Sequence, residues 1–138
     1  MQRINKNFLT AIIEATPNAI YIKDEDGKYL MINEQGANSV GKKVEDFIGK
    51  DDKEVFPAEL ANKVRALDKK VFDGSAYNGE EAVDEDTIFY SYKFIIEDPE
   101  TGERVLAGIS TDISKFKKME RELFDARLKA EEASKHKS

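Results

Sequence analysis

The sequence contains no cysteine and only one histidine, His136, near its C-terminal end. The missing cysteine excludes disulfide bonds, thiolate metal sites and a covalent thiol adduct with a bound cofactor. The missing internal histidine excludes a histidine-ligated haem and a histidine general base within the domain. Several common kinds of cofactor and enzyme site are therefore removed before any motif is considered.

Long apolar runs and excess positive charge are also lacking. No run approaches the roughly 20 apolar residues that a membrane-spanning helix needs. The first residues do not form a signal peptide, so we expect a cytoplasmic protein. The 138 residues carry a net charge of −6, which argues against nucleic acid or an anionic membrane as a partner. The length fits one hydrophobic core.

Hydrophobic periodicity and turn residues group the strands at both ends of the chain, with helices between them. We expect helices over residues 3–15 and 57–72, strands over 19–23, 28–33, 76–83, 87–96 and 104–113, and a helix from residue 114 onward. This order predicts an α+β fold in which an antiparallel sheet carries helices on one face. The last strand runs into the last helix without a linker, so strain in the sheet could reach whatever follows the helix.

Three segments carry a resemblance to a known family: PNAIYIKDEDGKYLMIN at 17–33, FIGKDDKEVFP at 47–57 and GISTDIS at 108–114. In this order and at this spacing they resemble a PAS domain. The resemblance implies a five-stranded antiparallel sheet with helices that enclose a small-molecule cavity against one face, and it implies sensing, dimerisation and signal transmission rather than catalysis. It divides the chain into an N-terminal cap helix (1–16), a PAS core (17–113) and a C-terminal signalling helix (114–138).

The C-terminal tail at 129–138 resembles the linker that, in many histidine kinases, leads to the helix bearing the phosphorylated histidine. The chain ends before that motif, and His136 lies outside such a pattern. We therefore expect a sensor module of a cytoplasmic two-component histidine kinase, with an output domain in cis. The alternatives are a ligand-free dimerisation or spacer module, or a PAS module of another output protein such as a diguanylate cyclase.

The resemblance also suggests which strand residues face the cavity. Side chains alternate between the two faces of a strand, and the resemblance to the family suggests which alternate residues face the cavity. These are Ile20, Ile22, Leu30, Ile32, Tyr90, Tyr92, Phe94, Leu106, Gly108 and Ser110. Because this set has no Lys, Arg or His, it argues against a strongly anionic ligand and allows a small apolar or neutral one. The missing cysteine excludes a cysteinyl-flavin. The alternative is that the tyrosines are core residues whose hydroxyls reach the surface.

Residues of the opposite parity are equally apolar: Tyr21, Tyr29, Met31, Ala107 and Ile109. An exposed face of this kind favours association, so something should cover it. We expect the N-terminal helix to do so through Ile4, Phe8 and Ile12, from the same chain or from a partner. Simple packing within the chain is the alternative.

The last helix has an apolar seam spaced 3, 4, 3, 4, 3: Phe116, Met119, Leu123, Ala126, Ala130 and Ala133. This spacing is typical of a coiled coil and predicts a parallel homodimer. In such a pair Glu122 would lie opposite Arg127 of the other chain. The alanines bury little area, so the alternative is a solvated helix that frays after Leu123.

The junction between the last strand and this helix contains Asp112, Ile113 and Ser114. Asp112 and Ser114 are favourable N-cap types. We hypothesise that Asp112 also pairs with Lys93 or Lys115, so that rearranging the pair could change the helix angle.

No catalytic set or metal-ligand pattern is evident, so we do not expect an enzyme. The numerous acidic residues fall in turn-like, charged stretches, and we interpret them as solvated loop residues: Asp24, Asp26, Asp51, Asp52 and 84–86.

Overall fold

The computed structural model describes residues 5–135. The elements follow the order α1 (Lys6–Ala15), β1 (Ala19–Lys23), β2 (Tyr29–Ile32), α2 (Glu34–Ser39), the 3-10 helix η1 (Val44–Asp46), α3 (Asp52–Val55), α4 (Ala58–Phe72), β3 (Tyr77–Ala82), β4 (Ile88–Glu97), β5 (Arg104–Asp112) and α5 (Ser114–Lys135). The predicted elements are therefore present, with shifts of a few residues at their ends.

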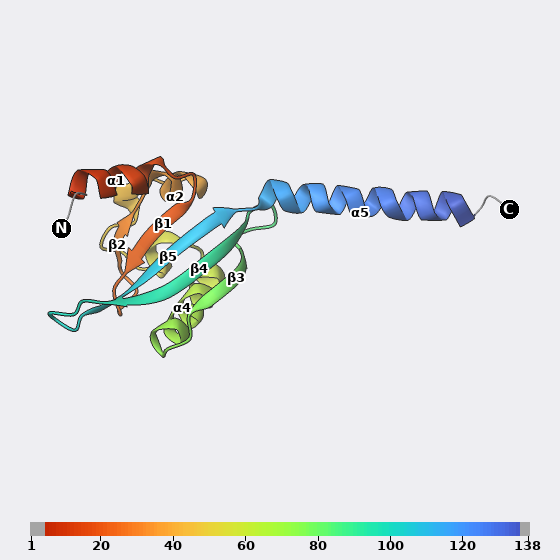
Figure 1. The fold of residues 1–138 in the computed structure, drawn as a ribbon. Coiled ribbons are helices and arrows are strands. Elements are labelled where there is room, and N and C mark those ends of the chain that lie inside the picture. Colours follow the sequence, from red (N-terminus) through yellow and green to blue (C-terminus); the bar gives the residue numbers. More distant parts are fainter. Residues whose placement is uncertain (1–4, 136–138) are drawn as a thin grey trace.

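The strands form one five-stranded antiparallel sheet in the order β2-β1-β5-β4-β3. The first and last strands, β1 and β5, thus pair with each other inside the sheet. The helices between β2 and β3 cover one face of the sheet, and α4 packs against β4 and β5. Figure 1 shows this arrangement. The α+β fold expected from the sequence is confirmed.

Local sequence explains where the covering helices begin. Asn33 caps α2, because its side chain accepts a hydrogen bond from the Gly36 amide. Asp51 and Glu54 form a reciprocal capping box at α3. Pro57 precedes α4, whose buried face includes Ala61 and Val71. These caps fix the loops that lead from β2 to α4 and thereby place α4 over the sheet.

The core lies between this helical layer and the sheet. Its aromatic rings meet edge to face, from Tyr21 to Tyr29, from Tyr29 to Phe47 and from Phe47 to Phe56. Leu106 of β5 and Val71 of α4 are also buried there. The rings connect the sheet to the segment that leads into α4.

Helix α1 is not packed on the outer face of the sheet. Phe8 and Ile12 are 59% and 60% exposed, and none of the helix is buried. The helix is held at its C-terminal end, where the Asn33 side chain donates a hydrogen bond to the Ile13 carbonyl. In Figure 1 it lies beside α2. Tyr21 and Tyr29, which the sequence placed on an exposed face, are instead buried by packing within the chain. Coverage of the outer face by the same chain's α1 is wrong, coverage by a partner stays a prediction, and Ile4 lies outside the described residues.

Helix α5 projects away from the sheet, separated from β5 by Ile113 alone (Figure 1). It has no buried residue and continues to Lys135, so it does not end at Leu123. Among the described residues, no helix combines the length and apolar character needed to cross a membrane.

Candidate functional site

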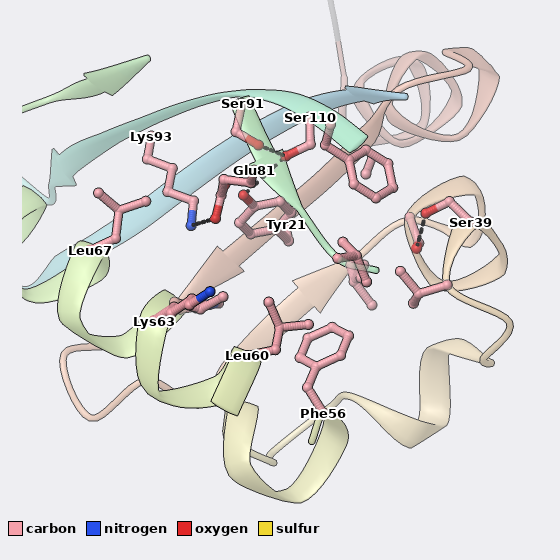
Figure 2. Close-up of a pocket in the computed structure, with 18 of the residues that line it drawn as sticks. Tyr21, Ser39, Phe56, Leu60, Lys63, Leu67, Glu81, Ser91, Lys93 and Ser110 are labelled. Atoms are coloured by element: carbon pink, nitrogen blue, oxygen red, sulfur yellow. Dashed lines mark hydrogen bonds and ion pairs between the residues drawn. The ribbon is translucent and has the colours of Figure 1, made fainter. Parts of the chain in front are cut away.

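A cavity of about 310 Å³ lies between the helical layer and the facing side of the sheet (Figure 2). This volume is at the lower end of the range of small-molecule sites. Apolar side chains make most of the wall, including Phe56, Leu60, Val64 and Leu67 from the helical side. Polar groups come mainly from the strands: Tyr21, Lys23, Tyr77, Glu81, Ser91, Lys93 and Ser110.

The predicted parity was wrong for most of the candidate ligand residues. Of the strand residues predicted to face the cavity, only Ile32 and Ser110 line it. Leu106 and Gly108 lie on the same face of the sheet as Ser110. Six others lie off the cavity wall: Ile20, Ile22, Leu30, Tyr90, Tyr92 and Phe94. Directly paired residues share a face, so Ser110 brings Ala19 and Ser91 inward with it. Because both faces of these strands are apolar, the sequence does not show which face is buried. Assigning the alternation one residue out of step exchanges the inward and outward residues.

The cavity wall includes the charged side chains Lys23, Glu81 and Lys93, which belong to a buried cluster of ion pairs. Lys23 Nζ lies 2.9 Å from Asp52 Oδ2 and 2.8 Å from Asp68 Oδ2. Lys93 Nζ lies 3.2 Å from both Asp68 Oδ1 and Glu81 Oε2. Two lysines thus face three carboxylates, and the cluster carries one net negative charge. We call these five residues the ion network.

The ion network joins β1, β3 and β4 to α3 and α4. Burial lowers the pKa of Lys23, but the Asp68 and Asp52 carboxylates more than offset this and hold its pKa above the usual value. The Asp52 carboxylate also accepts a 2.7 Å hydrogen bond from the Tyr29 hydroxyl. Burial, followed by Asp52, raises the pKa of Tyr29 well above its usual value. Burial also lowers the pKa of Lys93, but Tyr21, Asp68 and Glu81 more than offset this, so both lysines are charged at neutral pH.

Two interpretations of the sequence are corrected by this network. Asp52 is 2% exposed and paired, so it is not a solvated loop residue. The cavity wall also contains Lys23, Lys63 and Lys93, which removes the argument against an anionic ligand. Isolated lysines within the apolar strands AIYIK and IFYSYKFIIE were the signal that could have revealed buried pairs.

A second polar group in the wall is a short chain of hydroxyls. The Tyr21 hydroxyl lies 3.2 Å from Ser110 Oγ, which lies 2.7 Å from Ser91 Oγ. Gly108 makes this possible, because a Cβ atom at that position would overlap the Tyr21 ring. These hydroxyls can donate to or accept from a neutral polar group of a ligand.

The junction residues make local hydrogen bonds. The Asp112 carboxylate accepts from the Ser114 amide at 2.9 Å, a local bond to the first residue of α5, whose N-cap position is taken by Ile113 and not by Asp112 or Ser114. Ser114 Oγ accepts from the Ile88 amide at 2.9 Å, and the Ile113 amide donates to the Ile88 carbonyl. Lys93 is engaged in the ion network, so the hypothesis that Asp112 pairs with Lys93 is wrong. Among residues 5–135 no ion pair joins Asp112 to Lys115.

An ion pair that the sequence did not reveal ties α5 to the edge strand. Lys117 Nζ lies 2.7 Å from Glu80 Oε2 of β3 and 3.8 Å from Glu120 Oε1. Hydrogen bonding to Glu80 raises the pKa of Lys117. No pattern in the sequence relates these residues, because the contact depends on the direction in which α5 leaves the sheet.

The predicted seam of α5 is exposed along its length in this single chain. Phe116, Met119 and Leu123 are 63%, 58% and 63% exposed, and Ala126 and Ala130 are also exposed. Phe124 and Leu128 form further exposed apolar positions on another side of the helix. Dimerisation through the seam stays a prediction. The part of the chain that the structure describes has no cluster of His, Asp or Glu placed to hold a metal ion.

Comparison with known proteins shows which family and which solved structures this chain is similar to. The family described as the PAS fold matches residues 13–118. The PAS domain from Bordetella pertussis BvgS is 20% identical with a TM-score of 0.67, covering 89% of this chain and 96% of that chain. A sensory box sensor histidine kinase from Vibrio cholerae is 17% identical with a TM-score of 0.57, covering 78% and 90%.

A third solved structure, the Vibrio cholera VqmA–ligand–DNA complex, is 18% identical with a TM-score of 0.70. That match covers 81% of this chain and 53% of the VqmA chain. No curated protein matches the sequence.

Proposed function

The chain belongs to the PAS fold family, in agreement with the resemblance of its motifs, and we propose that it is the ligand-sensing and dimerising module of a cytoplasmic two-component histidine kinase. In this proposal a small molecule occupies the cavity and α5 passes the change to an output domain in cis. The module itself catalyses no reaction. The observation that carries the proposal is the cavity, whose apolar wall contains a few oriented hydroxyl and charged groups.

Transmission requires that the cavity and the output helix share one rigid element. β5 contributes Ser110 to the cavity wall and ends at Asp112, one residue before α5 begins. A ligand that prefers one arrangement of the sheet would therefore shift the population of helix directions, by no more than its difference in affinity for the two arrangements.

Dimerisation is supported by three unpaired apolar surfaces. These are the α5 seam, the apolar side of α1 with Phe8 and Ile12, and the outer face of the sheet, where Tyr92 and Ile96 are 50% and 47% exposed. Contiguous exposed apolar surfaces mark interaction sites in soluble proteins. A parallel homodimer would bury the seam and set Glu122 opposite Arg127 of the other chain.

The test is native mass spectrometry of freshly purified protein. We expect a dimer that retains a small molecule, which denaturation releases. A bare polypeptide, together with no thermal stabilisation by any member of a small-molecule library, would contradict sensing and favour a ligand-free spacer module. That second candidate rests on the ion network, whose charges are already paired without a ligand.

A further inference from the structure

Two consecutive glutamates of β3 face opposite sides of the sheet and make different ion pairs. Glu81 pairs in register with Phe89 and reaches Lys93 on the cavity side. Glu80 pairs in register with Tyr90 and also borders the cavity, but its carboxylate reaches Lys117 of α5. Adjacent residues of β3 therefore pair with the cavity wall and with α5: Glu81 with Lys93, and Glu80 with Lys117.

Glu81 is the most replaceable acid of the ion network. Its side chain is 19% exposed, whereas those of Asp68 and Lys93 are each 2% exposed. Asp68 contacts both lysines, but Glu81 contacts only Lys93 among the described residues. Loss of an anionic partner would destabilise the protein strongly, because the ammonium group of Lys93 is buried. A second anion in the cavity could supply that partner while Glu81 turns to solvent.

The charge count and the shape of the wall define that anion. The ion network carries one net negative charge, and removing the Glu81 carboxylate makes it neutral. A single ligand carboxylate restores the original balance, and Lys63 of α4 adds a further positive group to the wall. The helical side of the wall is otherwise mainly apolar, with Phe56, Leu60 and Val64 facing the space. The complementary molecule has one carboxylate and an apolar body.

Strand β3 is suited to respond, since it lies at the edge of the sheet and pairs only with β4. An edge strand can shift without breaking a second ladder of hydrogen bonds. The Glu81–Lys93 pair ties its cavity side to β4, so release of this pair loosens β3. Because Glu80 holds Lys117, a shift of β3 changes the restraint on the first turns of α5.

We propose that the cavity takes a monocarboxylate with an apolar body, whose carboxylate replaces Glu81 on Lys93, and that the release of Glu81 reaches α5 through Glu80 and Lys117. This rests on the proposed sensor function and adds to it the ligand class and the route of the signal.

The probes are acetate, butyrate and phenylacetate, each compared with its neutral amide. Binding is followed by amide chemical shifts of the isotope-labelled chain, and the response of α5 by the shifts of residues 115–120. The wild type is compared with Glu81→Gln, Glu80→Gln and Lys93→Met. Glu25→Gln is the matched control, because its 3.2 Å pair with Arg104 lies outside the cavity wall.

We expect phenylacetate to bind the wild type more tightly than its amide does. Glu81→Gln removes the competing carboxylate and should strengthen phenylacetate binding about tenfold without affecting the amide. Lys93→Met should abolish the preference for the carboxylate. Glu80→Gln should keep binding but weaken the shifts of residues 115–120, which β5 alone would then transmit, and Glu25→Gln should match the wild type in both.

The inference is overturned if no carboxylate binds Glu81→Gln, if amides bind as tightly as carboxylates, or if α5 responds equally in Glu80→Gln. A neutral molecule retained by the purified protein would, in that case, leave the sensor function standing. The sensor function would also be contradicted only if the purified protein retained no small molecule and no member of the small-molecule library stabilised it.

Discussion

Replacing Lys23 by methionine tests the energetic role of the ion network. Methionine keeps the length of the side chain and removes its ammonium group, so the network changes from one net negative charge to two. Removing one partner of a buried ion pair costs about 3–5 kcal/mol. Asp52 keeps the Tyr29 hydroxyl and Asp68 keeps Lys93, so we expect the lower end, about 3 kcal/mol.

Urea unfolding followed by circular dichroism at neutral pH measures this loss. The control is Glu25→Gln, which breaks an ion pair whose side chains are 38% and 56% exposed and should cost less than about 1 kcal/mol. The double variant Lys23→Met, Asp52→Asn should recover about 1–2 kcal/mol, because it removes a carboxylate that has lost its partner. Equal free energies of unfolding for Lys23→Met and Glu25→Gln would refute this reasoning.

Three further predictions concern the dimer, the cavity wall and pH. Leu123→Glu should convert the dimer to a monomer in light scattering, whereas Phe124→Glu, an equally apolar-to-acidic change off the seam, should leave it dimeric; dissociation by both would argue against the seam. Gly108→Ala should lower the free energy of unfolding by about 1–3 kcal/mol, because the new methyl group overlaps a tyrosine ring of β1; an unchanged thermal midpoint would contradict that packing. The pKa values of Tyr29 and Lys23 lie above their unfolded values of 10.0 and 10.5, so the stability they provide is complete below pH 10.0 and is lost as pH rises beyond it. Urea unfolding across that range should show that the free energy of unfolding falls as pH rises, and this fall should be shallower in Tyr29→Phe. A free energy of unfolding that rose with pH would contradict the prediction.

The order of helices and strands along the chain could be predicted because the relevant signals are local, whereas the pairing of β1 with β5 joins residues far apart in the sequence. Turn residues at Asp24 to Gly27, alternation in the strands and Pro57 before α4 each act within a few residues. The faces of the strands could not be predicted in the same way. Ile20 and Tyr21 are both apolar, and only the register with β5, which places Tyr21 against Gly108, decides which of them is buried.

The candidate site was harder to predict because its polar groups depend on long-range contacts. Lys23, Asp52 and Asp68 come from β1, α3 and α4, and no spacing in the sequence relates them. The pair of Glu80 and Lys117 likewise follows from the direction of α5. A lone lysine inside an apolar strand does indicate that a partner is needed, but it does not identify the partner.

The coupling between the cavity and α5 is tested most directly by filling the cavity from the helical side. Leu60→Trp on α4 places a large side chain in the cavity without touching the sheet-to-helix junction, and Ala58→Trp adds the same ring at an exposed position of α4. The measurement is amide hydrogen exchange of residues 114–120. We expect altered exchange there in Leu60→Trp and wild-type exchange in Ala58→Trp. Changes confined to the helical layer in a folded Leu60→Trp protein would contradict this coupling.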